Sequence, residues 1–247
     1  MSNLLGNLLS KVKETSESVS EAPPSKRARF EQACDMDPLK AIENFCEQVQ
    51  QKLSEYPPEQ KDKIEVEARL GLIINDGMRA TPRILQKGTT VLYGEMMRTA
   101  NYRFVSGVDP STFYKMVPKI SKSFRLKGQP ANLQETVFNM SNGIRVKWDS
   151  RHKRGLSEQK TRIAECNFLL PSCPFDFRIT VSMEQPGEMV ASPPSDWQQK
   201  RIKNRTSLSL EGNPWRVDIT DVEAEDMMAL GRGKVAVHEV EFEVQHA

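Results

Sequence analysis

From residue 64 to residue 245, apolar and polar side chains alternate with a period of two, which is typical of β-strands that bury one face. The alternation predicts nine strands, at residues 64–74, 101–105, 134–138, 143–149, 156–164, 175–184, 199–209, 215–222 and 235–245. Because few helical patterns interrupt these strands, we expect a mainly β fold, either a sheet closed on itself or a sandwich.

Two stretches have the period of helices instead. In residues 37–56 the apolar positions recur every three or four residues, and Asp37 followed by Pro38 is a typical helix start. A second helix is expected at residues 111–124, and the proline-containing stretch 185–197 is expected to be a loop. The apolar stripe of the first helix predicts that this helix packs against the core.

The first 36 residues are rich in Ser, Glu, Lys and Pro and poor in large apolar side chains. We therefore expect a disordered tail at residues 1–36, followed by one domain at residues 37–247. The leucines from Leu4 to Leu9 have helical spacing, which fits either a docking segment for a partner or a marginal helix without a ligand. The basic cluster at residues 23–29 predicts import into the nucleus.

The overall composition excludes several classes of protein. The 35 basic and 33 acidic side chains give a net charge of +2, which by itself does not indicate a nucleic-acid-binding protein. No apolar run approaches the roughly 20 residues that cross a bilayer, and residues 1–11 lack the pattern of a signal peptide. The four cysteines form no CxxC pair, which argues against a disulfide scaffold or a zinc site and fits an intracellular chain with reduced thiols.

The polar faces of several strands are charged almost throughout. The first and last strands each place three charged side chains on one face: Glu65, Glu67, Arg69 and Glu239, Glu241, Glu243. Like charges two residues apart repel each other, so three glutamates gain nothing on a solvated surface. A divalent cation such as Mg²⁺ would change that balance, because carboxylate oxygens are its preferred ligands.

Four further strands carry faces in which basic side chains predominate or mix with acidic ones: Arg145, Lys147; Glu158, Lys160, Arg162; Arg201, Lys203, Arg205; Arg216, Asp218, Thr220. Each face alone is typical of a solvated sheet. Together they predict a barrel with a charged interior and helices outside it. In such a barrel, cations would hold phosphate oxygens and glutamates would hold a metal, as phosphoryl transfer requires.

These motifs, in this order, resemble those of the tunnel-type mRNA 5′-triphosphatases of fungal, protist and viral capping systems, within the triphosphate tunnel metalloenzymes. The matching segments lie between Ile64 and Val244 and include, besides the two acidic strands, Arg145, Lys160, Glu184, Arg201-x-Lys203-x-Arg205 and Trp215-Arg216-x-Asp218-x-Thr220. The resemblance implies a closed antiparallel eight-stranded β-barrel that forms a charged tunnel, with flanking helices. Glu135 is the nearest candidate for an acidic residue that the family places before the arginine strand.

The resemblance also implies roles for the matched residues. The ligands of Mg²⁺ or Mn²⁺ would be Glu65, Glu67 and Glu243. The catalytic set would be Glu184, which positions or activates water, with Arg145, Lys160, Lys203 and Arg205. The phosphate-binding cations would be those four and Arg201. The supporting residues would be Arg69, Asp218, Thr220, Glu239 and Glu241, although Asp218 and Thr220 could equally form a salt bridge and a strand end.

The implied reaction removes the γ-phosphate of triphosphate-ended nascent RNA and leaves a diphosphate end, the first step of mRNA capping. A nuclear location follows, with mRNA guanylyltransferase and a second copy of the chain as partners. Two alternatives stay open: an inorganic or thiamine triphosphatase of the same superfamily, and a module that binds triphosphate RNA without cleaving it. No covalent intermediate is expected, because Cys166 and Cys173 lack the basic loop of a cysteine phosphatase.

Overall fold

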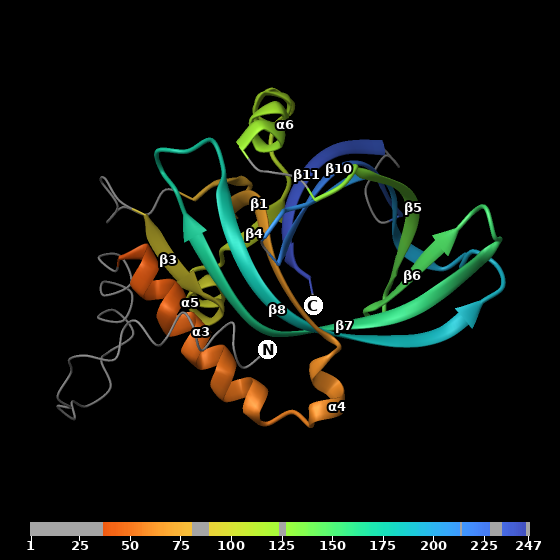
Figure 1. Ribbon diagram of the computed structural model, residues 1–247, viewed down its shortest axis with the longest axis horizontal. Coiled ribbons are helices and arrows are strands. Elements are labelled where there is room, and N and C mark those ends of the chain that lie inside the picture. Colours follow the sequence, from red (N-terminus) through yellow and green to blue (C-terminus); the bar gives the residue numbers. More distant parts are fainter. Residues whose placement is uncertain (1–36, 81–88, 124–126, 213, 228–233, 246–247) are drawn as a thin grey trace.

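The computed structural model describes residues 37–80, 89–123, 127–212, 214–227 and 234–245. Eight antiparallel strands close into a barrel in the order β11-β10-β9-β5-β6-β7-β8-β1, and β1 pairs again with β11 (Figure 1). Their bounds are β1 Ile64–Asn75, β5 Ala131–Met140, β6 Ile144–Asp149, β7 Arg154–Leu169, β8 Asp176–Val190, β9 Trp197–Ser209, β10 Trp215–Asp226 and β11 Lys234–Val244. The expected closed barrel is confirmed.

Strand β1 is shared between the barrel and a small extension of the sheet. Residues 67–69 pair with β11, whereas residues 71–74 pair with β4 (Arg103–Ser106), and the end of β1 pairs with β2 (Met78–Arg79). The change of partner occurs at Gly71, where a Cβ would collide with the carbonyl oxygen of Val105. Strand β3 (Thr90–Tyr93) extends the sheet in the same way by pairing with the second half of β7.

In the described ranges, four helices lie outside the barrel: α3 Pro38–Ser54, α4 Pro58–Lys61, α5 Gly94–Thr99 and α6 Pro110–Ser123 (Figure 1). Helix α3 begins as predicted, because Asp37 accepts a hydrogen bond from the backbone N–H of Leu39 at 3.1 Å and Pro38 occupies the first turn. The buried side chains of α3 are Ala41, Phe45 and Val49, which pack on the outer wall of the barrel. None of these helices is both long and apolar enough to cross a membrane.

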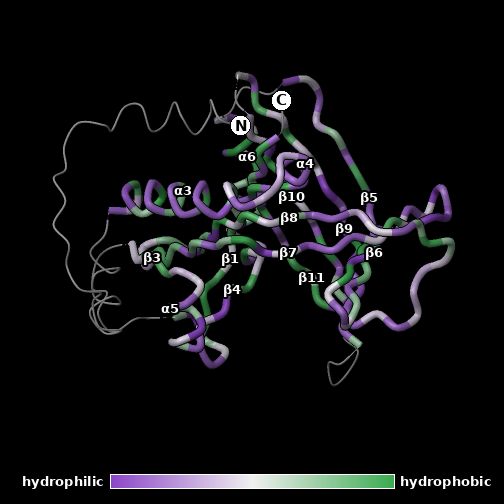
Figure 2. Tube along the Cα trace, turned by 90° about the horizontal axis from the view of Figure 1, so that it is seen from below, coloured by the Kyte–Doolittle hydropathy of each residue, from purple (hydrophilic) through white to green (hydrophobic). Residues whose placement is uncertain are grey.

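The hydrophobic cores lie between the barrel wall and the helices, not inside the barrel. One cluster joins Phe113 and Ile120 of α6 to Val217 and Val240 of the wall. A second joins α3 to β1, β3, β7 and β8, and a third lies under α5. The barrel strands therefore carry both hydrophilic and hydrophobic residues along their length (Figure 2). This arrangement leaves the inward faces free to be charged.

Some sequence expectations differ from the structure. The stretch 185–197 was expected to be a loop, which is wrong for residues 185–190 and for Trp197 and holds for residues 191–196: β8 continues to Val190 and β9 begins at Trp197. Its residues extend the β7–β8 hairpin, where Leu156 pairs with Met189, so cross-strand pairing outweighs the local effect of Pro186. The alternation did not predict β2, β3, α4 or α5, all of which are short. The expected tail at residues 1–36 lies outside the described residues.

Candidate active site

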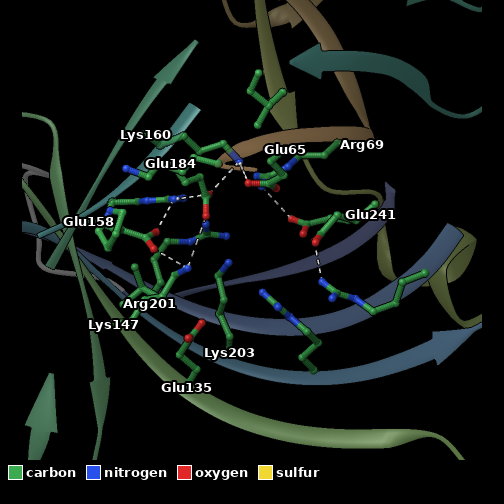
Figure 3. A pocket seen from close by; sticks show the side chains of 18 of the residues that line it. Glu65, Arg69, Glu135, Lys147, Glu158, Lys160, Glu184, Arg201, Lys203 and Glu241 are labelled. Carbon is green, nitrogen blue, oxygen red and sulfur yellow. Dashed lines mark hydrogen bonds and ion pairs between the residues drawn. The ribbon is translucent and has the colours of Figure 1, made fainter. Parts of the chain in front are cut away.

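The interior of the barrel holds a cavity of about 590 Å³ lined mostly by charged side chains (Figure 3). The lining residues come from the inward positions of the barrel strands, because alternate residues of a strand point to opposite faces. Of the predicted site residues, the cavity is lined by Glu65, Arg69, Arg145, Lys160, Glu184, Arg201, Lys203, Arg205, Glu241 and Glu243. No aromatic side chain is among its lining residues in the described part of the chain. The cavity is thus built to meet small charged groups.

Glu67 lies at the point where β1 meets both of its neighbours in the barrel. It is opposite Glu243 on β11 and opposite Thr180 on β8. Its carboxylate accepts hydrogen bonds from Thr180 Oγ1 at 2.9 Å and from Arg69 at 2.8 Å. Burial opposes ionisation, but the positive charges of Arg69 and Lys160 outweigh it and hold the pKa of Glu67 well below its ordinary value. Glu67 is therefore a fixed, ionised carboxylate.

Lys160 connects the predicted metal ligands to the predicted water-positioning glutamate. Its Nζ lies 2.8 Å from Glu65 and 3.4 Å from Glu184 (Figure 3). It also lies 3.3 Å from Glu67. Burial and a hydrogen bond with Glu184 raise the pKa of Glu65. The ammonium of Lys160 thus reduces the repulsion among the carboxylates of Glu65, Glu67 and Glu184. The raised pKa of Glu65 means that this carboxyl group also tends to keep its proton.

The acidic cluster has the donor chemistry for a hard divalent cation, because Glu65, Glu67 and Glu243 offer only carboxylate oxygens. Among the described residues, no three acidic, His or Cys side chains are already gathered as metal ligands. The reason is visible in the contacts: Lys160 holds Glu65 and Glu67, and Arg216 holds Glu243 at 2.5 Å. Burial raises the pKa of Glu243 despite Arg216, which marks a carboxylate short of positive charge. The residues present fit a divalent cation.

Glu184 lies between the acidic cluster and the basic side chains of β6. Arg145 donates a hydrogen bond to Glu184 at 2.8 Å and also pairs with Glu158. Lys147 lies 2.6 Å from Glu158 and 3.9 Å from Glu184. Glu184 is 28% exposed, toward the cavity, so a water molecule can reach its carboxylate. Several cations fix its orientation.

The basic strand β9 gives its three inward side chains different partners. Arg201 pairs with Glu239 at 2.8 Å, and Arg205 lies 3.5 Å from Asp218. Lys203 is 7% exposed, and within the described ranges no carboxylate oxygen lies within 4.0 Å of its Nζ. Burial is the main cause that lowers the pKa of Lys203 to about 8; Glu241 opposes the shift, and Arg201 adds to it. Lys203 is thus a buried cation that none of the described carboxylates pairs with.

The remaining predicted residues differ in the contacts that they make. Arg69 pairs with Glu241 at 3.3 Å, and Arg216 donates bidentately to Asp218 at 2.8 and 2.9 Å. Thr220 is 1% exposed, and its hydroxyl has no hydrogen-bond partner among the described residues. Arg69 and Asp218 thus make ion pairs of the kind that a supporting role needs, whereas Thr220 makes no such contact with the described residues, and its role stays a prediction.

The sequence interpretation assigned no role to several residues that line the cavity: Glu135, Lys147, Glu158 and Arg216. Glu135 was noted only as a counterpart of a family residue, and the structure places it opposite Lys203 across β5 and β9. The sequence could have predicted that Glu158 lines the cavity, because Glu158 is two residues from Lys160 and therefore lies on the same face of the strand. The burial of Glu158, at 6% exposed, comes from pairing with β6 and could not be read from its own strand.

Comparison with known proteins agrees with this geometry. Residues 36–247 match the family model described as mRNA capping enzyme, beta chain. The structure is similar to the S. pombe Pct1 RNA triphosphatase, with 22% sequence identity, a TM-score of 0.66, and coverage of 85% of this chain and 79% of that one. Pct1 in complex with the Spt5 CTD gives the same identity and coverage, with a TM-score of 0.65. The Pct1 likeness shows that the two proteins share a fold.

A more distant likeness is to the RNA triphosphatase domain of the mimivirus mRNA capping enzyme, with 12% identity, 80% and 87% coverage of the two chains, and a TM-score of 0.44. A comparison with curated protein sequences gives no match. The family model covers all of the described residues, including every predicted site residue. The chain therefore belongs to the family of mRNA capping enzyme beta chains, and it is a tunnel-type mRNA 5′-triphosphatase that acts in mRNA capping.

Proposed function

We propose that the barrel interior hydrolyses the bond between the β- and γ-phosphates of triphosphate-ended RNA with Mg²⁺ or Mn²⁺. The observation that carries this proposal is the opposition of two charge sets in one cavity. Glu65 of β1 and Glu243 of β11 line this cavity together with Lys203 and Arg205 of β9, and Glu67 lies opposite Glu243 where β1 pairs with β11. Phosphate oxygens and a divalent cation together would satisfy both sets, because each supplies the charge that the other lacks.

Lys203 is the first cation that we expect to bind the γ-phosphate. It is buried and has no ion-pair partner among the described carboxylates, so a phosphate oxygen would bind it without breaking such a pair. Arg205 is 3.5 Å from Asp218, and its Nε has no hydrogen-bond partner in the described part of the chain. A guanidinium in this state can still donate to phosphate. Arg145 would complete the set from β6.

Glu184 would orient the water that attacks the γ-phosphate. Arg145 and Lys160 hold its carboxylate at 2.8 and 3.4 Å, which fixes the direction of a side chain that lines the cavity. A cation bound by Glu65, Glu67 and Glu243 would neutralise negative charge on the transferred phosphoryl group. Lys160, which holds Glu65 and Glu67 here, would then be available to a phosphate oxygen of the substrate.

The proposed product also indicates the partners. A diphosphate RNA end is what an mRNA guanylyltransferase requires, so we propose that this chain works with one. The nuclear location rests on the basic cluster at residues 23–29, and a homodimer remains a prediction that light scattering of the purified protein would test. Pct1 carries the Spt5 CTD in one of the similar structures, and we propose a protein partner of the same kind for this chain.

Inorganic triphosphate remains a second candidate substrate for a structural reason. The lining of the cavity, within the described residues, offers charged groups for phosphates and no aromatic ring on which a nucleobase could stack. The interior alone therefore does not distinguish RNA from a bare triphosphate.

The deciding experiment measures γ-phosphate release from triphosphate-ended RNA, with Mg²⁺ and with Mn²⁺, for the native chain and for Glu67→Ala. Inorganic triphosphate is measured in parallel at limiting concentration. We expect metal-dependent release from RNA that the substitution abolishes. Release from inorganic triphosphate alone would replace the RNA assignment, and binding without release under either metal would indicate a recognition module.

A further inference from the structure

A second hollow of about 350 Å³ continues the interior of the barrel and is more basic than the first. The two hollows share Arg69, Asn139, Arg145 and Lys160 in their walls. On β7 the first is lined by residues 158 and 160 and the second by residues 160 and 162. On β8, residues 184 and 186 line the first hollow, and residues 178 and 182 line the second hollow. The hollows are thus consecutive stretches of one tunnel.

The charge balance changes from one hollow to the next. The first hollow is lined by several acidic and several basic side chains. Among the described residues, the second is lined by the single carboxylate of Glu67 and by five basic side chains: Arg69, Arg145, Lys160, Arg162 and Arg178. A stretch with this balance attracts anions, and its described lining offers no second carboxylate for a metal. Its chemistry is that of a binding site for phosphate groups.

Arg178 is the basic side chain of the second hollow that an anion would stabilise most. It lies opposite Arg69 across β1 and β8, and like charges in that position repel. Within the described residues, no carboxylate oxygen lies within 4.0 Å of it, and its buried Nε has no hydrogen-bond partner. Its guanidinium lies 4.5 Å from the ring centroid of Phe104, which holds the group in place without neutralising it. Burial, Arg162 and Arg69 lower the pKa of Arg178 to about 10.

Arg162 continues the basic surface from the tunnel to the solvent. Its side chain is 51% exposed and pairs with Glu165, also on β7, at 2.6 Å. Because the guanidinium is half exposed, solvent screens its pairing with Glu165, and it can exchange Glu165 for a phosphate. Ser182 lies opposite Arg162 across β7 and β8 and also lines the hollow, which adds a neutral hydrogen-bond donor.

We infer that Arg178 and Arg162 bind the phosphodiester groups of the RNA that follow the triphosphate. The transcript would enter the tunnel beside the turn between β5 and β6, where Gly143 and Ile144 line the second hollow, and its triphosphate would reach the first hollow. This inference rests on the RNA substrate proposed above. It explains how a tunnel whose first hollow meets only phosphates favours a polynucleotide: the chain supplies further phosphates, spaced along the tunnel.

Binding of RNA that carries no triphosphate tests this site without any catalytic step. The probe is a 5′-hydroxyl octaribonucleotide, and its dissociation constant is measured by fluorescence anisotropy across a salt series. We expect Arg178→Gln to weaken binding by about threefold to tenfold and to reduce the salt slope by about 0.7, the value for one lost phosphate contact on a single strand. The matched control is Arg98→Gln, because Arg98 is exposed on α5 and lines neither hollow.

Steady-state kinetics then distinguish the possible sources of the phosphate. With triphosphate-ended RNA, Arg178→Gln should raise KM by a similar factor, and the rise should be absent when inorganic triphosphate is the substrate. If the hollow instead conducts the released phosphate, the substitution will lower kcat on both substrates and alter inhibition by inorganic phosphate. Equal losses on both substrates, or none on either, overturn the inference.

The two proposals fail in different ways. If the native chain releases no phosphate from RNA but hydrolyses inorganic triphosphate, the proposed function fails, and the anisotropy result still decides the RNA site. If RNA is hydrolysed but Arg178→Gln and Arg162→Gln both bind the 5′-hydroxyl octaribonucleotide as the native chain does, the inference fails alone. Thermal unfolding of each variant excludes loss of the fold as the cause.

Discussion

Glu67 and Glu243 lie directly opposite each other across β1 and β11, the pairing that closes the barrel. Side chains in such a position have Cβ atoms about 5 Å apart, close enough for two carboxylates to share one cation. Without that cation, Arg69 and Lys160 balance Glu67, and Arg216 balances Glu243. The same two residues therefore link the closure of the fold to the proposed metal site.

Replacing Glu67 by Gln should remove activity while keeping the fold. The amide keeps the side-chain volume and can still accept from Thr180, but it cannot supply the negative charge that a divalent cation needs. We expect kcat to fall by about 100-fold or more. Phosphate release at saturating Mg²⁺ measures the effect. Glu188→Gln makes the same change at an exposed position of β8 and should leave kcat unchanged; a folded Glu67→Gln protein with near-native kcat would disprove the ligand assignment.

Substrate binding should weaken as the pH rises through about 8, because burial lowers the pKa of Lys203 to about 8. Below that pH the ammonium is charged and can hold phosphate, and above it the free enzyme has a neutral amine. The measurement is KM for triphosphate-ended RNA between about pH 6.5 and pH 9.5. In Lys203→Arg the guanidinium stays charged, so the rise in KM should disappear. The same rise in both proteins would assign it to another group.

The pKa of Lys203 also has a consequence for stability. The pKa of the folded state, about 8, lies below the unfolded value of about 10.4, so between these values the unfolded chain binds more protons. The contribution of Lys203 to the free energy of unfolding should therefore increase as the pH rises from about 8 to about 10. Urea unfolding of the native chain and of Lys203→Met at both pH values isolates this contribution, which is absent in the variant.

Asp176 should be essential for stability but not for chemistry. It is fully buried, pairs with Arg79 at 2.5 Å, and accepts from the backbone N–H groups of Ile73 at 2.9 Å and Leu170 at 2.8 Å. Asp176→Ala would leave these donors unsatisfied, at a cost of about 3–5 kcal/mol in the free energy of unfolding.

Urea denaturation measures this cost. The exposed pair of Glu223 with Lys234 supplies the matched comparison, because Glu223→Ala should change the free energy of unfolding by less than about 1 kcal/mol. If Asp176→Ala and Glu223→Ala lowered the free energy of unfolding equally, the buried hydrogen bonds of Asp176 would stabilise the fold no more than an exposed ion pair does.

Thiol modification should leave activity intact. Burial raises the pKa of Cys166 to about 12, so at neutral pH its thiol is protonated and, being fully buried, inaccessible. Cys166 packs under α3, away from the residues that line the cavity. Iodoacetamide treatment followed by phosphate release and mass spectrometry tests this. Loss of activity that tracks with alkylation of one cysteine would favour a covalent mechanism and contradict the proposed one.

Much of the site could be predicted from the sequence because strand alternation is local. Glu65, Glu67 and Arg69 share a face wherever β1 lies, and so do Arg201, Lys203 and Arg205 on β9. The closed barrel followed from charged faces that needed a common interior. The shared faces depend only on residues two apart, whereas the closure by eight strands and the roles of the site residues were implied by the resemblance to tunnel-type triphosphatases.

The rest depends on register, which no single strand encodes. That Glu158 pairs with Arg145 and Lys147 follows from the alignment of β6 with β7. That Arg178 faces Arg69 follows from the alignment of β8 with β1. The short strand β3 was missed because four residues carry too little alternation, and it is ordered by pairing with the end of β7. Long-range pairing therefore decided the details that the local pattern left open.

The closing contact between β1 and β11 joins segments about 170 positions apart in the chain. A nascent chain that has not yet produced β11 exposes two unpaired edges, on β1 and on β10. It also carries the glutamates of β1 without Glu243. Catalytic competence should consequently appear late, as a single event when the last strand docks. Enzymatic activity would then serve as a folding reporter, since partly folded molecules would hold neither the cation nor the triphosphate.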